Sequence, residues 1–283
     1  MSLARVVCVI PARDAATTIQ ASVAAARALP GVELVIVTDD GSADPTGDYA
    51  AASGAIVVTH QRSRGRAAAI ESAVNALGVL ESRDRRPECG TVLLLDAGLG
   101  ATVSRAQPLI GPVVSARADL TIAVPPAPSA GEPATGRSAT GTSVSGDSSA
   151  GRPSAEDRGG WDVVETAAAR GIAELAGWTP RAPLATNRCL TRKAYELASP
   201  LAAGAGADVG MTIDLLRAGL RISEVEVAFD RYEGHGGLAG RLDRARTLAD
   251  VTRALTARGL VGHGLSEIKD AGGIRGLIDK LRG

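Results

Sequence analysis

The sequence predicts an α/β protein in which a mostly parallel sheet is flanked by helices. Short runs of branched aliphatic residues alternate along the chain with segments of helical periodicity, the order typical of β–α–β crossover units. The runs contain few polar residues, which favours strands buried on both faces. The chain of 283 residues is long enough to bury a full core, and we expect a single Rossmann-like, nucleotide-binding domain.

Residues 1–124 form the first predicted half of this domain. Its strands are expected at Val6 to Ile10, Leu34 to Val37, Ile56 to Val58, Val92 to Leu95, and Leu120 to Val124. Pro11 is expected to end the first strand. Helices are predicted from Thr17 to Gly31, around Thr46 to Ser53, after Arg66, and up to Arg117.

Residues 125–160 are dominated by Pro, Ser, Gly, Thr and Ala, with Val144 as their single branched aliphatic residue. We predict a disordered insertion there, either a passive linker or a functional lid, because such a segment cannot repay the entropy of ordering. Order is expected to resume at Trp161, and residues 161–283 form the second half with its C-terminal helices.

The second half has three further predicted elements. Asp208 follows a glycine-rich turn and can cap a helix that ends at Gly219. A strand is expected from Glu224 to Arg231, and a long amphipathic helix begins at Leu238.

Composition excludes several classes of protein. Lys plus Arg and Asp plus Glu both total 31, and aromatic residues make up 2%, which argues against a protein that binds nucleic acid. No apolar run approaches the roughly 20 residues of a transmembrane segment. Three cysteines without metal-ligand spacing suggest reduced thiols and a cytoplasmic protein.

Four polar clusters follow predicted strands or lead into helices: Ala12 to Asp14, Asp39 to Ser42, Arg62 to Arg66, and Asp96. Because the carboxyl ends of parallel strands share one edge, the clusters can converge on one ligand. Carboxylates accept hydrogen bonds from a base or ribose, and Arg66 near a helix start can hold phosphate. Since neither common phosphate-loop spacing occurs in the early strand-to-helix turns, we expect a nucleotide site without such a loop.

Each cluster also has a purely structural interpretation. Asp39, Asp40 and Asp96 can belong to turns, Asp208 to a helix cap, and Arg62 to Arg66 to a solvated loop. The three histidines, His60, His235 and His263, are expected on the surface without a role.

Several motifs together resemble the family 2 type of GT-A glycosyltransferases, and in particular soluble actinobacterial enzymes similar to glucosyl-3-phosphoglycerate synthase. They are Val9 to Arg13, Val35 to Ser42, Arg64 to Arg66, the strand to Asp96, Asn187 to Arg192, Gly206 to Asp208, and Asp230-Arg231. The resemblance covers most of the chain outside residues 125–160. It implies a GT-A fold in which residues 1–124 bind a nucleotide-sugar and residues 161–283 form the acceptor side.

The resemblance also implies roles for individual residues. Asp40 would contact the uracil of a UDP-sugar, and Arg66 stands where the family often has a lysine facing the diphosphate. Asp96 would be the first acid of the D-x-D motif that binds Mg²⁺ or Mn²⁺, and Asp208 a general base if the enzyme inverts configuration. The donor pocket would be lined by Pro11, Ala12, Arg13, Asp39, Asp40, Arg66, Asp96 and Arg231.

The chain departs from the family pattern at three places. Gly98 replaces the second acid of D-x-D, Asp230 stands where relatives commonly have histidine, and Ala15-Ala16 replace an acid after the first strand. Two alternatives follow for the donor diphosphate. Asp96 and Asp230 could hold a metal together with diphosphate oxygens, or Arg66 and Arg231 could neutralise it without metal.

Three functions are consistent with these residues. The first is transfer of a sugar from a nucleotide donor, with UDP expected, to a small or lipid-linked acceptor, by an enzyme that could form a homodimer. The second is a catalytically weak or inactive relative that binds nucleotide-sugar or acts as a scaffold. The third is a nucleotidyltransferase, although the glycine- and lysine-rich loop expected after its first strand is missing.

Overall fold

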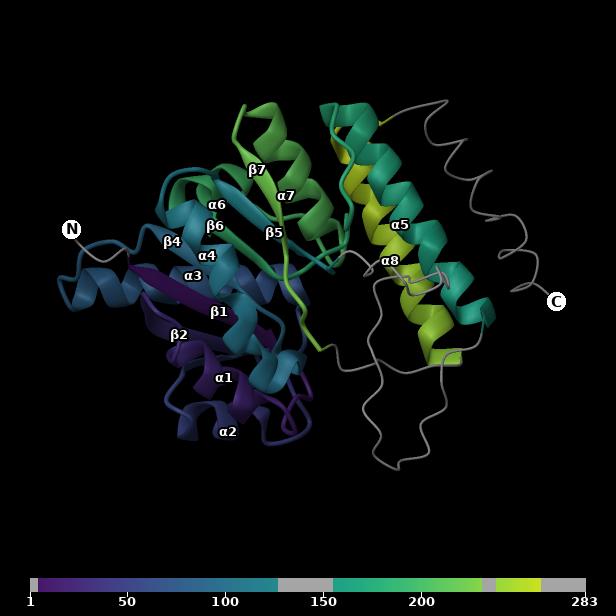
Figure 1. Cartoon of the computed structure of the whole chain (residues 1–283). Coiled ribbons are helices and arrows are strands. Elements are labelled where there is room, and N and C mark those ends of the chain that lie inside the picture. Colours follow the sequence, from purple (N-terminus) through teal and green to yellow (C-terminus); the bar gives the residue numbers. More distant parts are fainter. Residues whose placement is uncertain (1–4, 127–154, 231–237, 261–283) are drawn as a thin grey trace.

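The computed structural model describes residues 5–126, 155–230 and 238–260. Its seven-stranded sheet has the order β3-β2-β1-β4-β6-β5-β7 and carries helices on both faces (Figure 1). Neighbouring strands are parallel except where β6 pairs with β4 and with β5. This arrangement confirms the predicted α/β class with a mostly parallel sheet.

The elements have the following bounds. The strands are β1 (Val6–Ala12), β2 (Val32–Asp39), β3 (Ile56–Thr59), β4 (Thr91–Leu94), β5 (Leu120–Val124), β6 (Arg188–Thr191) and β7 (Ile222–Glu226). The helices are α1 (Ile19–Arg27), α2 (Thr46–Ala52), α3 (Arg66–Arg83), the 3-10 helix η1 (Ala97–Ala106), α4 (Gln107–Val114), α5 (Ala155–Ala176), α6 (Arg192–Ala198), α7 (Gly206–Arg217) and α8 (Leu238–Ala257).

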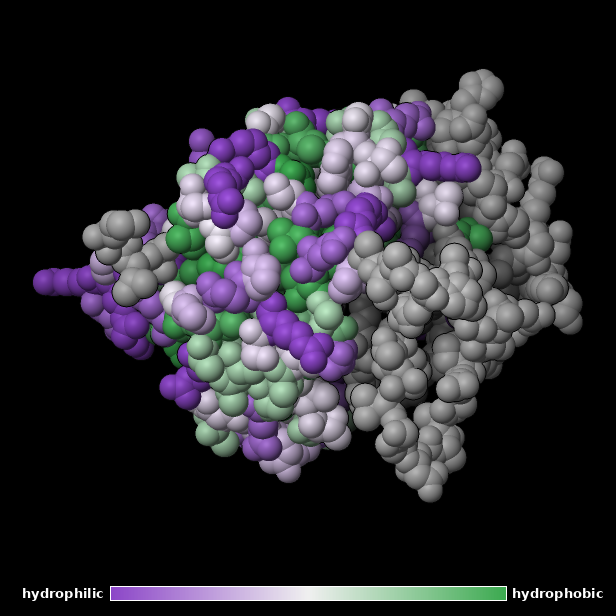
Figure 2. Space-filling model, viewed as in Figure 1, coloured by the Kyte–Doolittle hydropathy of each residue, from purple (hydrophilic) through white to green (hydrophobic). Residues whose placement is uncertain are grey.

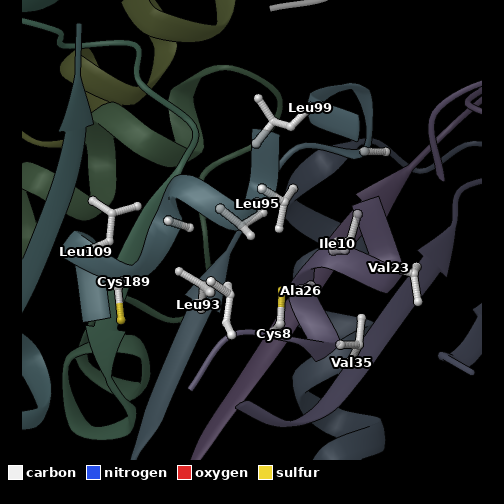
Figure 3. Close-up of a cluster of buried hydrophobic side chains, with 14 of the residues drawn as sticks. Cys8, Ile10, Val23, Ala26, Val35, Leu93, Leu95, Leu99, Leu109 and Cys189 are labelled. Carbon is white, nitrogen blue, oxygen red and sulfur yellow. The ribbon is translucent and has the colours of Figure 1, made fainter. Parts of the chain in front are cut away.

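Alternate residues of β1 supply the cores on the two faces of the sheet. Cys8 and Ile10 pack with α1, η1 and α4, and Figure 3 shows them beside Leu93 and Leu95 and facing Val23 of α1. Val7 and Val9 belong to the opposite core, with α3, α6 and α7. A third cluster joins α5, α7 and α8, and α5 and α8 run side by side in Figure 1.

Pro11 lies inside β1, so the prediction that it ends the strand is wrong. β1 continues to Ala12, which is paired with Asp39. On the side of β4, the carbonyl of Val9 accepts a hydrogen bond from the N–H of Leu95. The backbone groups of residue 11 point to the same side as those of residue 9, beyond Leu94, the last residue of β4. The pairing of β1 with β4 ends there, where Pro11 has no N–H to donate, while the pairing with β2 continues to Ala12.

β6 was not predicted, because the segment before it was interpreted as a loop through Arg188. The strand places a fully buried arginine between β4 and β5, and arginine is rarely a core residue unless paired. The late strand is also shorter than predicted, since β7 ends at Glu226.

Helix α5 begins at Ala155, before the predicted resumption of order at Trp161. The remainder of the predicted insertion, residues 127–154, lies outside the described residues, as do Arg231, His235 and His263.

The surface in Figure 2 shows hydrophilic residues interspersed with small hydrophobic areas. Among the helices of the described ranges, none combines the length and apolar character needed to cross a bilayer. Cys8, Cys89 and Cys189 are buried and free.

Candidate functional site

The carboxyl ends of β1, β2, β3 and β4 lie together at one edge of the sheet. Backbone hydrogen bonds between neighbouring strands continue beyond the last residues of β2, β3 and β4. Asp40 N–H donates to Ala12 O (2.8 Å), His60 N–H to Asp39 O (2.9 Å), and Leu95 N–H to Val9 O (3.1 Å). Asp40, His60 and Asp96 therefore follow adjacent strands at one edge of the sheet, which is where ligands bind in open α/β sheets.

Asp40 is buried and holds the basic loop of residues 62–65 against the end of β2. One carboxylate oxygen lies 2.6 Å from His60 Nδ1 and accepts from Arg64 N–H (2.8 Å); the other accepts from Ser63 Oγ (2.7 Å) and Gly65 N–H (2.8 Å). These four partners occupy the roughly four lone-pair positions at which a carboxylate accepts hydrogen bonds. The loop geometry is thus fixed by one side chain.

The pKa of Asp40 follows from this environment. Burial would raise the pKa, but the hydrogen bonds from Arg64, His60, Ser63 and Gly65 outweigh it and lower the pKa from 3.8 to about 2. Asp40 is therefore a carboxylate under all ordinary conditions.

His60 is buried, so the prediction of a surface histidine is wrong. Its ring bridges Asp40 and Ser72, whose Oγ lies 2.9 Å from Nε2. The position of His60 in the sequence could have indicated that it belongs to the site. It follows β3 directly, just as Asp40 follows the neighbouring strand β2.

Asp39 has the structural role that was one alternative for it. Its carboxylate accepts from the backbone N–H of Ser42 (3.0 Å) and from the Ser42 hydroxyl, which closes the turn after β2. Asp14 then joins this turn to the loop after β1 by accepting from Ala43 N–H (2.7 Å). Gly41 has a φ of +71°, and a Cβ there would come within 2.8 Å of the backbone of Ser63.

Arg66, the first residue of α3, contacts the acid that follows β4. Its Nη1 donates to Asp96 Oδ1 (2.8 Å) and its Nη2 to the carbonyl of Thr186 (2.6 Å). The other oxygen of Asp96 accepts from the Thr186 hydroxyl, and Asn187 Oδ1 accepts from Asp96 N–H (2.9 Å). The four predicted polar clusters are thereby joined into one hydrogen-bonded edge.

Asp208 completes a group of four alternating charges, in which Arg188 and Asp208 are buried and the side chain of Asp96 is 39% exposed. Asp208 lies 3.5 Å from Arg66 Nε and 3.2 Å from Nε of Arg188, whose side chain is fully buried. Burial lowers the pKa of Arg188, opposed by Asp208 and reinforced by Arg66. Arg188 is held further by donation to Ala185 O (2.7 Å) and Thr212 Oγ1 (2.9 Å).

The prediction that Asp208 caps its helix is wrong. Helix α7 begins at Gly206 after the N-cap residue Ala205, and Asp208 lies within the first turn, where its side chain faces the two arginines. The sequence motif from Asn187 pointed to this region, but it gave no role to Arg188, Thr186 or Asn187.

The remaining candidate residues are not among these four charges. Asp230 is exposed and pairs with Arg105 (3.1 Å). Arg13 is exposed beside Asp14 (3.6 Å), and Pro11 is half-buried next to buried Ala12. Arg231 lies outside the described residues.

The donor atoms at this edge do not fit a resident divalent metal. In residues 5–126, 155–230 and 238–260, no three His, Cys, Asp or Glu side chains gather closely enough to hold one. Asp96 and Asp230 are each engaged by an arginine, Arg66 and Arg105 respectively. Mg²⁺ and Mn²⁺ bind preferentially to carboxylate oxygens. A metal at Asp96 or Asp230 would therefore have to displace the guanidinium group that contacts the carboxylate.

Solved structures of a glucosyl-3-phosphoglycerate synthase from Mycobacterium tuberculosis share this architecture. Its complex with phosphoglyceric acid is 22% identical with a TM-score of 0.65, over 92% of this chain and 81% of that chain. Its complex with Mn²⁺, UDP and glucosyl-3-phosphoglycerate is 22% identical with a TM-score of 0.64 over the same shares. A complex with Mg²⁺ and UDP is 21% identical with a TM-score of 0.64, again over 92% and 81%.

These similarities establish that the chain has the fold of a GT-A glycosyltransferase, as the sequence motifs predicted. No protein-family model and no curated protein matches the sequence.

Proposed function

We propose that the protein is a glycosyltransferase that transfers a sugar from a UDP-linked donor to an acceptor hydroxyl. The proposal is carried by one observation: the polar side chains after β2 and β4 are joined at a single edge through Asp40, Arg66 and Asp96. The shared fold supports it, because M. tuberculosis glucosyl-3-phosphoglycerate synthase binds UDP together with Mn²⁺ or Mg²⁺.

Each residue at the edge has a proposed task. Pro11, Ala12 and Arg13 line the nucleotide side, and Asp40 keeps the loop of residues 62–65 beside it. Arg66 faces the diphosphate, at the N-terminus of α3, where the helix dipole also favours an anion. Preorganised cations of this kind stabilise the negative charge that grows on the departing UDP.

Asp208 is proposed to position the arginines. Its carboxylate lies between the guanidinium groups of Arg66 and Arg188 and can hold both of them in place. Its alternative role, general base in an inverting reaction, stays a prediction. Asp208→Asn tests the two roles, because loss of a base lowers kcat while loss of a positioning group also weakens UDP binding.

Calorimetric titration with UDP and a panel of UDP-sugars tests the proposed function, followed by an assay for slow hydrolysis of each sugar that binds. We expect UDP to bind and at least one UDP-sugar to be hydrolysed. Arg66→Met should weaken binding, whereas Arg83→Met, at the exposed opposite end of the same helix, should leave it unchanged. Binding without hydrolysis would favour a nucleotide-sugar binder, and no binding at all would refute the proposal.

A further inference from the structure

Asp96 has no acidic partner at its own loop. The residue two positions later is Gly98, which lies at the start of η1 and does not have a positive φ, so its backbone would accept an aspartate. Both oxygens of Asp96 are already engaged, one by Arg66 and the other by Thr186. The cation next to Asp96 in this protein is a guanidinium.

Arg66 is held in one orientation by three different segments of the chain. Asp96 follows β4, the carbonyl of Thr186 precedes β6, and Asp208 belongs to α7. A guanidinium has five N–H donors, of which these hydrogen bonds use two. Its Nε is buried and faces Asp208 at 3.5 Å, so a ligand from solvent does not reach it. The second N–H of each Nη is left for another anion.

The charges around this position favour an incoming diphosphate. Arg66 and Arg188 are balanced by Asp96 and Asp208, so the group of four has no net charge. Arg62 and Arg64 lie in the loop that leads to α3, both exposed, and within the described part of the chain neither forms an ion pair. Arg62 and Arg64 are thus two unpaired cations in the loop just before Arg66, whose side chain is held in place.

We propose that Arg66 takes the place of a divalent cation at the donor diphosphate, with Arg62 and Arg64 as outer cations, so that the protein binds UDP without metal. This inference rests on the proposed function, since it assigns the charge chemistry of the same site. A planar, always charged guanidinium suits it, because it can donate to two phosphate oxygens at once.

The first test compares UDP titrations in EDTA with titrations in excess MnCl₂. We expect dissociation constants that agree within about twofold, because the counter-charge is built into the chain. Binding that is more than about tenfold tighter with Mn²⁺ would overturn this inference while leaving the proposed function intact. UDP that binds in neither buffer would instead overturn the proposed function.

The second test uses variants in EDTA. Arg66→Met should weaken UDP binding about tenfold or more, as loss of charge-assisted hydrogen bonds does, and Arg83→Met should not. Arg66→Lys keeps the charge and serves if the methionine variant does not fold; it should retain part of the affinity. UDP affinity of Arg66→Met equal to that of the unsubstituted protein would refute the role of Arg66.

The third test restores the missing acid. Electron paramagnetic resonance measures Mn²⁺ binding. The unsubstituted protein should not bind Mn²⁺, whereas the double variant Gly98→Asp with Arg66→Met should bind it. In that variant, Arg66→Met frees Asp96 and Gly98→Asp supplies a second carboxylate. Tight Mn²⁺ binding by the unsubstituted protein alone would contradict the proposal.

Discussion

The imidazole Nδ1 of His60 lies 2.6 Å from a carboxylate oxygen of Asp40, in a buried pair that joins the end of β3 to the end of β2. The same carboxylate binds the backbone of the loop that leads into α3. Two neighbouring strands and the start of a helix are thereby fixed to one another by a single carboxylate.

Replacing His60 should therefore destabilise the fold. We expect His60→Ala to lower the free energy of unfolding by about 1–3 kcal/mol, because Asp40 loses a buried partner. Ser72→Ala removes only the contact at the other ring nitrogen and should cost less. Urea denaturation of both variants checks this, and equal losses would contradict a special role for the pair.

The low pKa of Asp40 predicts a dependence of stability on acid. Because the folded-state pKa of about 2 lies below the ordinary 3.8, ionised Asp40 stabilises the fold above pH 3.8, and this stabilisation disappears as the pH falls through about 2. The shift corresponds to about 2 kcal/mol. Unfolding free energies measured at a series of pH values should show this loss, and Asp40→Asn should lack that share of it. An unchanged profile in the variant would refute the assignment.

Gly41 should resist substitution for two reasons that can be separated. Gly41→Ala places a Cβ against the backbone of Arg62 and Ser63 in a residue with φ of +71°. Gly219→Ala has a similar φ of +74° but open space around the added carbon. We expect about 1 kcal/mol of destabilisation for Gly219→Ala from backbone strain, and more for Gly41→Ala, together with weaker UDP binding. Equal melting temperatures for the two variants would show that the clash is relieved.

The ion pair of Arg188 with Asp208 should respond differently from a surface pair. Arg188→Met leaves Asp208 short of a buried partner, and we expect a loss of about 3–5 kcal/mol. Arg221→Met breaks the solvent-exposed pair with Asp119 and should cost much less, because water screens exposed charges. Adding Asp208→Asn to Arg188→Met should restore part of the stability. Chemical denaturation of the unsubstituted protein, the two single variants at these positions and the double variant measures the coupling.

The sequence predicted six of the seven strands, five as runs of apolar residues flanked by turns and β7 as an alternation of polar and apolar residues. The polar clusters were also found, since their positions after strands follow from the same runs. Their contacts were not, because the pairing of Arg66 with Asp96 depends on strand order and on the return of the chain at Thr186. β6 and the buried Arg188 were missed because periodicity cannot identify a core arginine whose partner lies on another element.

The place of β6 in the sheet has a consequence for how the protein is made. In the sheet, β5 has β6 and β7 as its neighbours, and both lie after it in the chain. During synthesis, a strand of five buried residues must therefore wait without a hydrogen-bonded partner until Arg188 and its followers have left the ribosome. Residues 1–124 released alone would leave both β4 and β5 with unpaired edges, which favour aggregation. The fold is thus completed only when the second half arrives.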